Sequence, residues 1–170
     1  MAVVSNGTTI IDAGALGSGV ATGKMTLIKT LTASSSSTLS FVHGASSVVF
    51  NSTYDKYVFK FINIHPSTDN LNFQFNFSID SGSNYNVTKT TTYFRAYNTE
   101  DGSNGLGYRT SYDLAQSTSY QTLMVGIESQ NDNNNCGELT IFNPSSTVFQ
   151  KHFMATSSFV QTSENAQNSF

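Results

Sequence analysis

The chain has 170 residues, of which 11% are charged and 12% aromatic, and its formal net charge is −3 at pH 7. The length suits a single domain, and the charged fraction is less than half of the roughly 25% usual for soluble domains. The chain lacks the basic footprint of a nucleic-acid-binding protein, so nucleic acid is not expected as a partner.

Residues 1–24 are rich in Gly and small side chains and differ from the rest of the chain. Such a segment is either a disordered terminus or an arm that docks on a neighbouring protein. A purely solvated tail has little use for apolar anchors, so we favour the arm, with Ile10, Ile11 and Leu16 as its docking residues. The expected division is an N-terminal arm over residues 1–24 and a β-sandwich domain over residues 25–170.

Apolar residues recur in short alternating segments from residue 25 onward. They predict strands near residues 25–31, 39–41 and 48–50. Residues 57–64 are apolar on both faces for much of their length, which predicts a central strand. Pro66 ends it, because proline cannot donate to a strand ladder.

The clearest strand signal is residues 71–80, LNFQFNFSID, in which odd positions are apolar and even positions polar. Strand side chains point alternately to opposite faces, so this run predicts a strand with one face in the core and one in water. We expect Phe73, Phe75 and Phe77 to face a second sheet.

A polar turn at residues 81–84 follows this run, and residues 85–97 are the expected partner in the longest hairpin of the molecule. The outer face of the run carries Asn72, Gln74 and Asn76 and no charge before position 80. Neutral groups lose less than charges on desolvation. These three residues are therefore candidates for contact with a second subunit, and plain solvent surface is the alternative.

The remaining segments complete an all-β pattern. We expect strands near residues 123–127, 139–141 and 148–154, loops at 98–107 and 130–137, and one helical turn at 113–116. Eight or nine short strands with no room for crossover helices predict an antiparallel β-sandwich, jelly-roll-like in topology.

Catalytic and cofactor-binding motifs are not recognisable in the chain. His43, His65 and His152 are dispersed, with no carboxylate or cysteine at metal-ligand spacing. No nucleophile elbow or Gly-rich nucleotide loop occurs, and the carboxylates are scattered, mostly in expected turns. We expect a non-enzymatic protein without metal or cofactor.

The Asn- and Tyr-bearing loops at residues 98–109 and 129–137 present amides and aromatic rings, which are groups that recognise sugars. The candidate ligand residues are Tyr97, Asn104, Tyr108, Asn133 and Asn134. Solvated connecting loops use the same residue types, so an ordinary loop remains the alternative.

The single cysteine, Cys136, cannot form a disulfide within the chain. No apolar run approaches the ~18 residues that span a bilayer, and no positively charged start precedes an apolar stretch. Neither a secretion signal nor a membrane anchor is expected.

Several phrases occur in an order that resembles a module of virion proteins from marine tailed phages, especially cyanophages. They are KTLTAS at 29–34, TLSFV at 38–42, FKFINIHP at 59–66, TKTTT at 88–92, YDLAQ at 112–116 and LTIFNPSST at 139–147. The resemblance covers residues 23–154. It implies a structural protein on the virion exterior, assembled in the host cytoplasm, and transfers no catalytic residue.

The resemblance leaves three functions open. The favoured one is an accessory protein that decorates the capsid or belongs to the tail and attaches to other virion proteins through its arm. The alternatives are a host-receptor appendage that binds surface glycans and a glycan-cleaving tail enzyme.

Modules of this kind continue with further strands, whereas residues 161–169 are polar. The chain is therefore expected to lack the last strands or to be shortened. A missing strand leaves an edge for a neighbouring subunit, most plausibly in a homotrimer.

Overall fold

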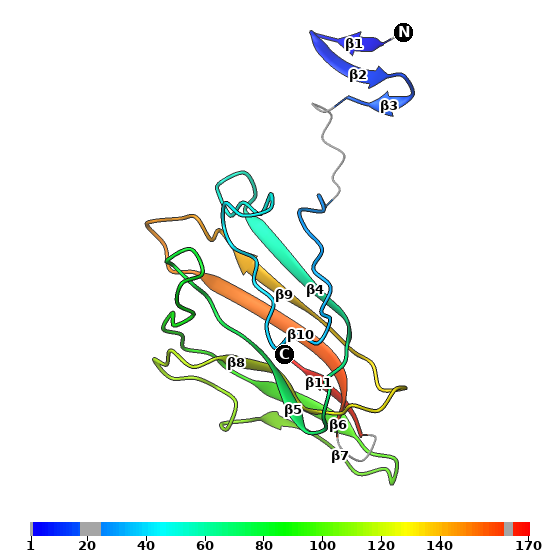
Figure 1. Cartoon of the computed structure of the whole chain (residues 1–170), viewed down its shortest axis with the longest axis vertical. Helices are drawn as coiled ribbons and strands as arrows, with labels where there is room; N and C mark the ends of the chain where they lie inside the picture. The colour runs from blue at the N-terminus through cyan, green and yellow to red at the C-terminus, as the bar shows by residue number, and fades with distance from the viewer. Residues whose placement is uncertain (1, 18–24, 162–164) are drawn as a thin grey trace. The chain divides into compact units, whose positions relative to one another are not determined.

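A computed structural model of the chain describes residues 2–17, 25–161 and 165–170. All regular structure in these residues is antiparallel β, which confirms the predicted fold class (Figure 1). The chain divides into two units, Met1–Thr32 and Ala33–Phe170. They are called the N-terminal unit and the sandwich unit below.

The N-terminal unit contains a three-stranded meander of β1 (Val3–Ser5), β2 (Thr8–Asp12) and β3 (Ala15–Leu16). Asn6 and Gly7 connect the first two strands with φ of 47° and 79°, and Ala13 and Gly14 connect the next two with φ of 46° and 83°. Two successive residues with positive φ match the twist of a tight hairpin. Both glycines therefore serve hairpin turns in a segment whose Gly content suggested flexibility.

The sandwich unit is built on a long antiparallel sheet in which six strands follow one another. Their order is β4 (Lys56–Ile64), β9 (Asn135–Phe142), β10 (His152–Gln161), β11 (Asn165–Ser169), β6 (Phe94–Asn98) and β7 (Asn104–Tyr108). The remaining two strands, β5 (Leu71–Phe75) and β8 (Gln121–Ile127), pair with each other. They join the long sheet at one point, where Ile127 pairs with Gln161 of β10.

The β5–β8 pair packs over the inner face of the long sheet. Every residue of β8 is buried, and its apolar side chains form a core cluster with Phe159 of β10. The rings of Phe73 and Phe61 meet edge to face at 4.9 Å, and Phe75 and Phe77 lie 5.1 and 5.8 Å from Phe153. The prediction that Phe73, Phe75 and Phe77 face another sheet is confirmed.

Irregular chain extends this second layer. The rings of Phe41 and Phe50 pack on Phe59 of β4, yet the segments predicted as strands at 25–31, 39–41 and 48–50 form none. Side chains take the place of ladder partners there: the backbone N–H of Phe50 donates to Nδ1 of His43. Apolar alternation thus predicted strand pairing wrongly here, and it predicted burial only in part: Phe41 and Phe50 pack on β4, whereas Met25 and Leu27 are 69 and 81% exposed.

The predicted hairpin between residues 71–80 and 85–97 is wrong. β5 ends at Phe75 and pairs with β8, while β6 starts only at Phe94 and pairs with β7 and β11. The next residue, Asn76, uses its side chain to bond backbone groups of other segments, which ends the ladder. Ile79 at the end of the run is 89% exposed.

Several other boundaries also differ from the predictions. β4 lies at an edge of the long sheet rather than in its centre, and residues 113–116 form no helical turn. β7 and β9 begin inside the predicted loops 98–107 and 130–137, respectively. β10 starts at His152, four residues after the predicted position 148.

The polar segment near the C-terminus also forms a strand, contrary to the expectation that it would add none. β11 fits between β10 and β6. Its inward side chains Gln167 and Ser169 are both 3% exposed, and Ser169 Oγ donates to the Leu123 carbonyl at 2.6 Å. Hydrophobic periodicity cannot reveal a strand whose buried face is polar.

Candidate functional site

Strand register brings several loops to one end of the long sheet. Ile64 at the end of β4 pairs with Asn135 at the start of β9, and Gln161 at the end of β10 pairs with Asn165 at the start of β11. Asn98 at the end of β6 pairs with the first residue of β7. The β8–β9 loop, the end of β4 and the β6–β7 turn therefore share this end.

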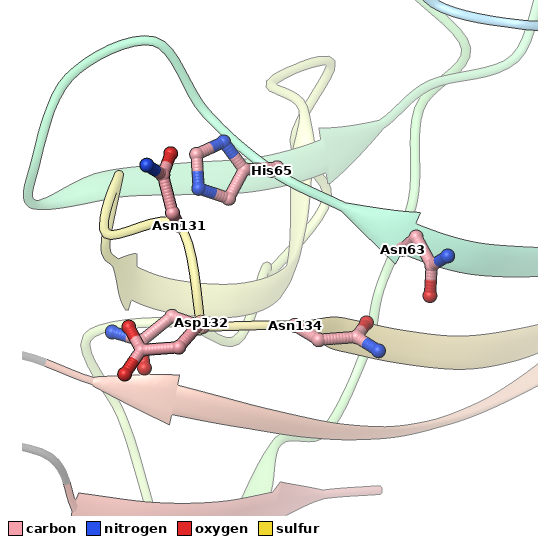
Figure 2. A pocket seen from close by; sticks show the side chains of 6 residues that line it. Asn63, His65, Asn131, Asp132 and Asn134 are labelled. Carbon is pink, nitrogen blue, oxygen red and sulfur yellow. The ribbon is translucent and has the colours of Figure 1, made fainter.

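An open depression of about 470 Å³ lies where β4 ends beside the β8–β9 loop (Figure 2). All of its lining residues are polar: Asn63, His65, Asn131, Asp132, Asn133 and Asn134. Four amides, an imidazole and one carboxylate therefore face the same space, and no Phe or Tyr ring is among the described residues that line it.

The β4 side of the depression is shaped by a bulge. The β4–β9 register shifts between Phe61 and Ile64, and Asn63 within that shift has a φ of 56°. Asparagine tolerates this left-handed conformation better than most residues. An extra residue in one strand re-aims the side chains beside it. The bulge thus places Asn63 at the rim.

One histidine ties the loop to β4. Nε2 of His65 lies 2.7 Å from the carbonyl oxygen of Gln130. Since a carbonyl only accepts, Nε2 carries the proton, and in the neutral ring Nδ1 remains as an acceptor. This hydrogen bond links the chain just after β4 to the β8–β9 loop, although the two residues are 65 positions apart.

Two further contacts anchor the loop. Asp69 accepts hydrogen bonds from the Ser129 hydroxyl and N–H at 2.6 and 2.8 Å, which lower the pKa of its carboxyl group. Asn135 is fully buried; its amide donates to the Ile64 carbonyl at 2.8 Å and accepts from the Val160 N–H at 3.0 Å. Both ends of the loop are held by these contacts, so its position does not depend on His65 alone.

The open groups of the depression suit a neutral polar ligand. The side chains of Asn63, Asn131 and Asp132 are exposed and form no hydrogen bond with another described residue. Amides and carboxylates together donate to and accept from hydroxyl groups. Within the described part of the chain, no group of three or more His, Cys, Asp or Glu side chains is placed to hold a metal ion.

The predicted ligand residues do not form one site. Asn133 and Asn134 line the depression as members of the β8–β9 loop. Tyr97 and Asn104 lie near the same end of the sheet, but β6 is three strands from β9, or roughly 14 Å. Tyr108 lies at the opposite end of β7, and its hydroxyl donates to Asp113.

The ring of Tyr97 packs against its neighbours within the sandwich unit. Its ring covers Gly105, where an added Cβ would lie 2.8 Å from the ring. The guanidinium groups of Arg95 and Arg109 lie 5.6 and 6.0 Å from its centroid. A ring surrounded in this way is poorly placed to stack on a sugar.

The sequence-based candidates missed four lining residues, Asn63, His65, Asn131 and Asp132. The available signals were Asn63 and His65 shortly before Pro66, where a strand was expected to end, and the Asn-rich loop itself. What joins them is the β4–β9 pairing, which links residues more than seventy positions apart. No local pattern encodes that pairing.

The residues proposed for subunit contact are engaged within the chain. Gln74 donates to the Thr122 hydroxyl at 3.0 Å, and the Asn72 side chain accepts from the Gly126 N–H at 3.0 Å. The Asn76 amide donates to the Tyr85 and Thr118 carbonyls. Their role in contact with a second subunit stays a prediction.

The docking residues of the N-terminal unit fall on two faces of its meander. Ile11 pairs with Val3 on one side and with Leu16 on the other, so these three form one row across the strands. Val3 and Leu16 are each 54% exposed and Ile11 is 40% exposed. Ile10 points to the opposite face, because adjacent strand residues alternate, and it is partly buried.

Comparisons of the chain with protein-family models, with curated proteins and with solved structures find no match. In the described residues, no helix has the length and apolar character to cross a membrane. Three features of the chain bear on its function: the depression, the row of Val3, Ile11 and Leu16, and the resemblance of the sequence to phage virion proteins.

Proposed function

We propose that this chain is a non-enzymatic structural protein of a phage particle, carried on the virion exterior and attached to capsid or tail proteins through residues 1–24. The order of sequence phrases over residues 23–154 supports the virion assignment. The row of Val3, Ile11 and Leu16 supports attachment.

The main support for attachment is the row of Val3, Ile11 and Leu16. Exposed apolar side chains on one face of a small sheet favour binding of a partner protein that buries them. Full burial of a Val, Leu or Ile side chain stabilises by roughly 1.5–3 kcal/mol, so completing the burial of each half-exposed residue contributes about 1 kcal/mol. A three-stranded sheet needs a packed apolar face for independent stability. A virion protein bound on this face would supply it.

The test replaces Ile11 and Leu16 by Ser and measures incorporation into particles assembled in the phage host. Asp12→Ser, on the same strand, is the control for altered surface chemistry. Incorporation should fall about tenfold or more for the double variant and stay unchanged for the control. Equal incorporation of the double variant and the original chain would refute attachment through this row.

A second function is favoured by the depression: binding of a neutral host-surface glycan. Asn63, Asn131 and Asp132 together offer donors and acceptors for hydroxyl groups. Cleavage of the glycan is a weaker proposal, because the depression contains a single carboxylate and glycosidases generally use two.

Glycan-array binding of the full chain tests this second function. The double substitution Asn131→Ala and Asp132→Ala should lower the affinity for any bound glycan by at least about tenfold. Asn104→Ala on the β6–β7 hairpin should leave the affinity unchanged. An array without a bound neutral glycan, or equal effects of both changes, would remove the proposal. Release of reducing sugar that depends on Asp132 would indicate cleavage instead.

A further inference from the structure

The two edges of the long sheet differ in charge and regularity. β4, at one edge, carries Lys56 and Lys60 and contains the bulge at Asn63. β7, at the other edge, has the sequence NGLGY with no charged residue and a regular register with β6. Charges and bulges are the features that protect an edge strand from pairing with another chain. β4 has both and β7 has neither.

An exposed apolar patch adjoins the β7 edge. We call it the β7 patch; it consists of Phe94, Leu106, Tyr108 and Phe170, exposed by 43, 76, 43 and 57%. Phe94 pairs with Tyr108 on one side and exchanges two backbone hydrogen bonds with Phe170 on the other. The four side chains therefore lie on the outer face, away from β8.

The backbone of β7 has pairing groups directed outward. The hydrogen bonds Thr99 N–H to Ser103 and Arg109 N–H to Tyr93 fix which pairs of the β6–β7 ladder are hydrogen-bonded. By the alternation of antiparallel ladders, the backbone groups of the two glycines then face β6. Those of Asn104, Leu106 and Tyr108 face the edge, where no described residue pairs with them.

We propose that β7 pairs antiparallel with β7 of a second copy of the chain, with Leu106 on the two-fold axis. Asn104 of each copy then lies opposite Tyr108 of the other. The three outward-facing residues of each strand give about six backbone hydrogen bonds. The two β7 patches become continuous across the joined sheet, and no charged residue of either strand faces a like charge. This pairing does not depend on the virion assignment.

The same features argue against β4 of a second copy as the pairing partner of β7. A head-to-tail contact would set β7 against β4, where the bulge at Asn63 interrupts a regular ladder and Lys56 and Lys60 must approach an apolar patch. A two-fold contact uses one self-complementary surface on both copies. The result is a dimer, whereas a homotrimer would need the head-to-tail contact.

Sedimentation equilibrium of the full chain tests the pairing. Leu106→Lys puts two ammonium groups near the axis and should lower the association constant by about tenfold or more. Ile62→Lys is the matched control, since Ile62 is 69% exposed on the opposite edge strand. Thermal unfolding of both variants checks that folding is intact.

Cross-linking gives an independent readout. In a Cys136→Ser background, Leu106→Cys brings two thiols together at the axis, where the expected Cα–Cα distance of about 5.5 Å permits a disulfide. Ile62→Cys is the control. Rapid oxidation to a dimer for Leu106→Cys alone supports the pairing. A monomer at all concentrations, a trimer, or association unaffected by Leu106→Lys overturns it.

Discussion

Asparagine has opposite roles in two regions of the sandwich unit. Asn76 and Asn135 bond backbone groups inside the fold, whereas Asn63 and Asn131 face the open depression without a hydrogen bond to a described residue. The residue type is the same in both regions. The surrounding backbone decides whether the amide holds the fold or is presented outward.

The internal amides replace missing ladder partners. Asn76 follows the last residue of β5, where irregular chain brings the Tyr85 and Thr118 carbonyls close and leaves them without strand partners. The bond to the Tyr85 carbonyl is partly buried, and a carbonyl that loses its partner there destabilises the fold. The loop backbone around the depression is exposed to water, so its carbonyl groups do not require an amide side chain as a partner.

Substitution of Asn76 is expected to cause the largest loss of unfolding free energy. Its Oδ1 also accepts from Nζ of Lys89 at 2.5 Å, and Lys89 is only 7% exposed, with a pKa lowered by burial. Asn76→Ala removes that acceptor and leaves a buried cation poorly satisfied. We expect a loss of about 3 kcal/mol in unfolding free energy by denaturant titration.

Asn131→Ala is the control for this substitution and should change the unfolding free energy by less than about 0.5 kcal/mol. Similar losses for the two variants would mean that the contrast between internal and open amides is wrong.

A smaller but still clear loss is expected for Asn135→Ala. The change leaves the Ile64 carbonyl and the Val160 N–H without this partner in a fully buried position. The expected loss is about 2 kcal/mol. It should be accompanied by faster hydrogen exchange at the start of β9, and unchanged exchange there would show that Asn135 does not hold the loop.

The smallest expected effect is a loss of stability at low pH. The hydroxyl of Ser78, followed by the side chain and N–H of Asn84, lowers the pKa of Asp80 from 3.8 to about 2. A carboxyl with a depressed folded pKa stabilises the fold above its unfolded pKa, and this contribution is lost as pH falls from about 4 to about 2. Asp69, which anchors the β8–β9 loop, shifts in the same direction.

Unfolding free energy should therefore decrease below about pH 4. Asp80→Asn should give a shallower decrease than the original chain, while the two should run parallel above pH 5. An identical slope for both proteins below pH 4 would contradict the assignment to Asp80.

The sequence was most informative where burial is apolar. It predicted the all-β class, the strand at residues 57–64 and the inward direction of Phe73, Phe75 and Phe77, because alternation reports which side chains are buried. It failed for β11, where the buried face is Gln167 and Ser169, and for β7, where Gly105 and Gly107 occupy the inner face. For the site, it found Asn133 and Asn134 in an Asn-rich loop, but neither Asn131 and Asp132 beside them nor Asn63 and His65 near the end of β4.

Local pattern alone thus determined that this chain forms antiparallel sheets and that Phe73, Phe75 and Phe77 point inward. The tertiary structure decided that β5 pairs with β8, that Asn76 is an internal hydrogen-bonding residue, and that Asn63 and His65 meet the β8–β9 loop. The physical reason is that alternation depends on one strand at a time. Pairing, by contrast, depends on which distant segment satisfies its backbone groups.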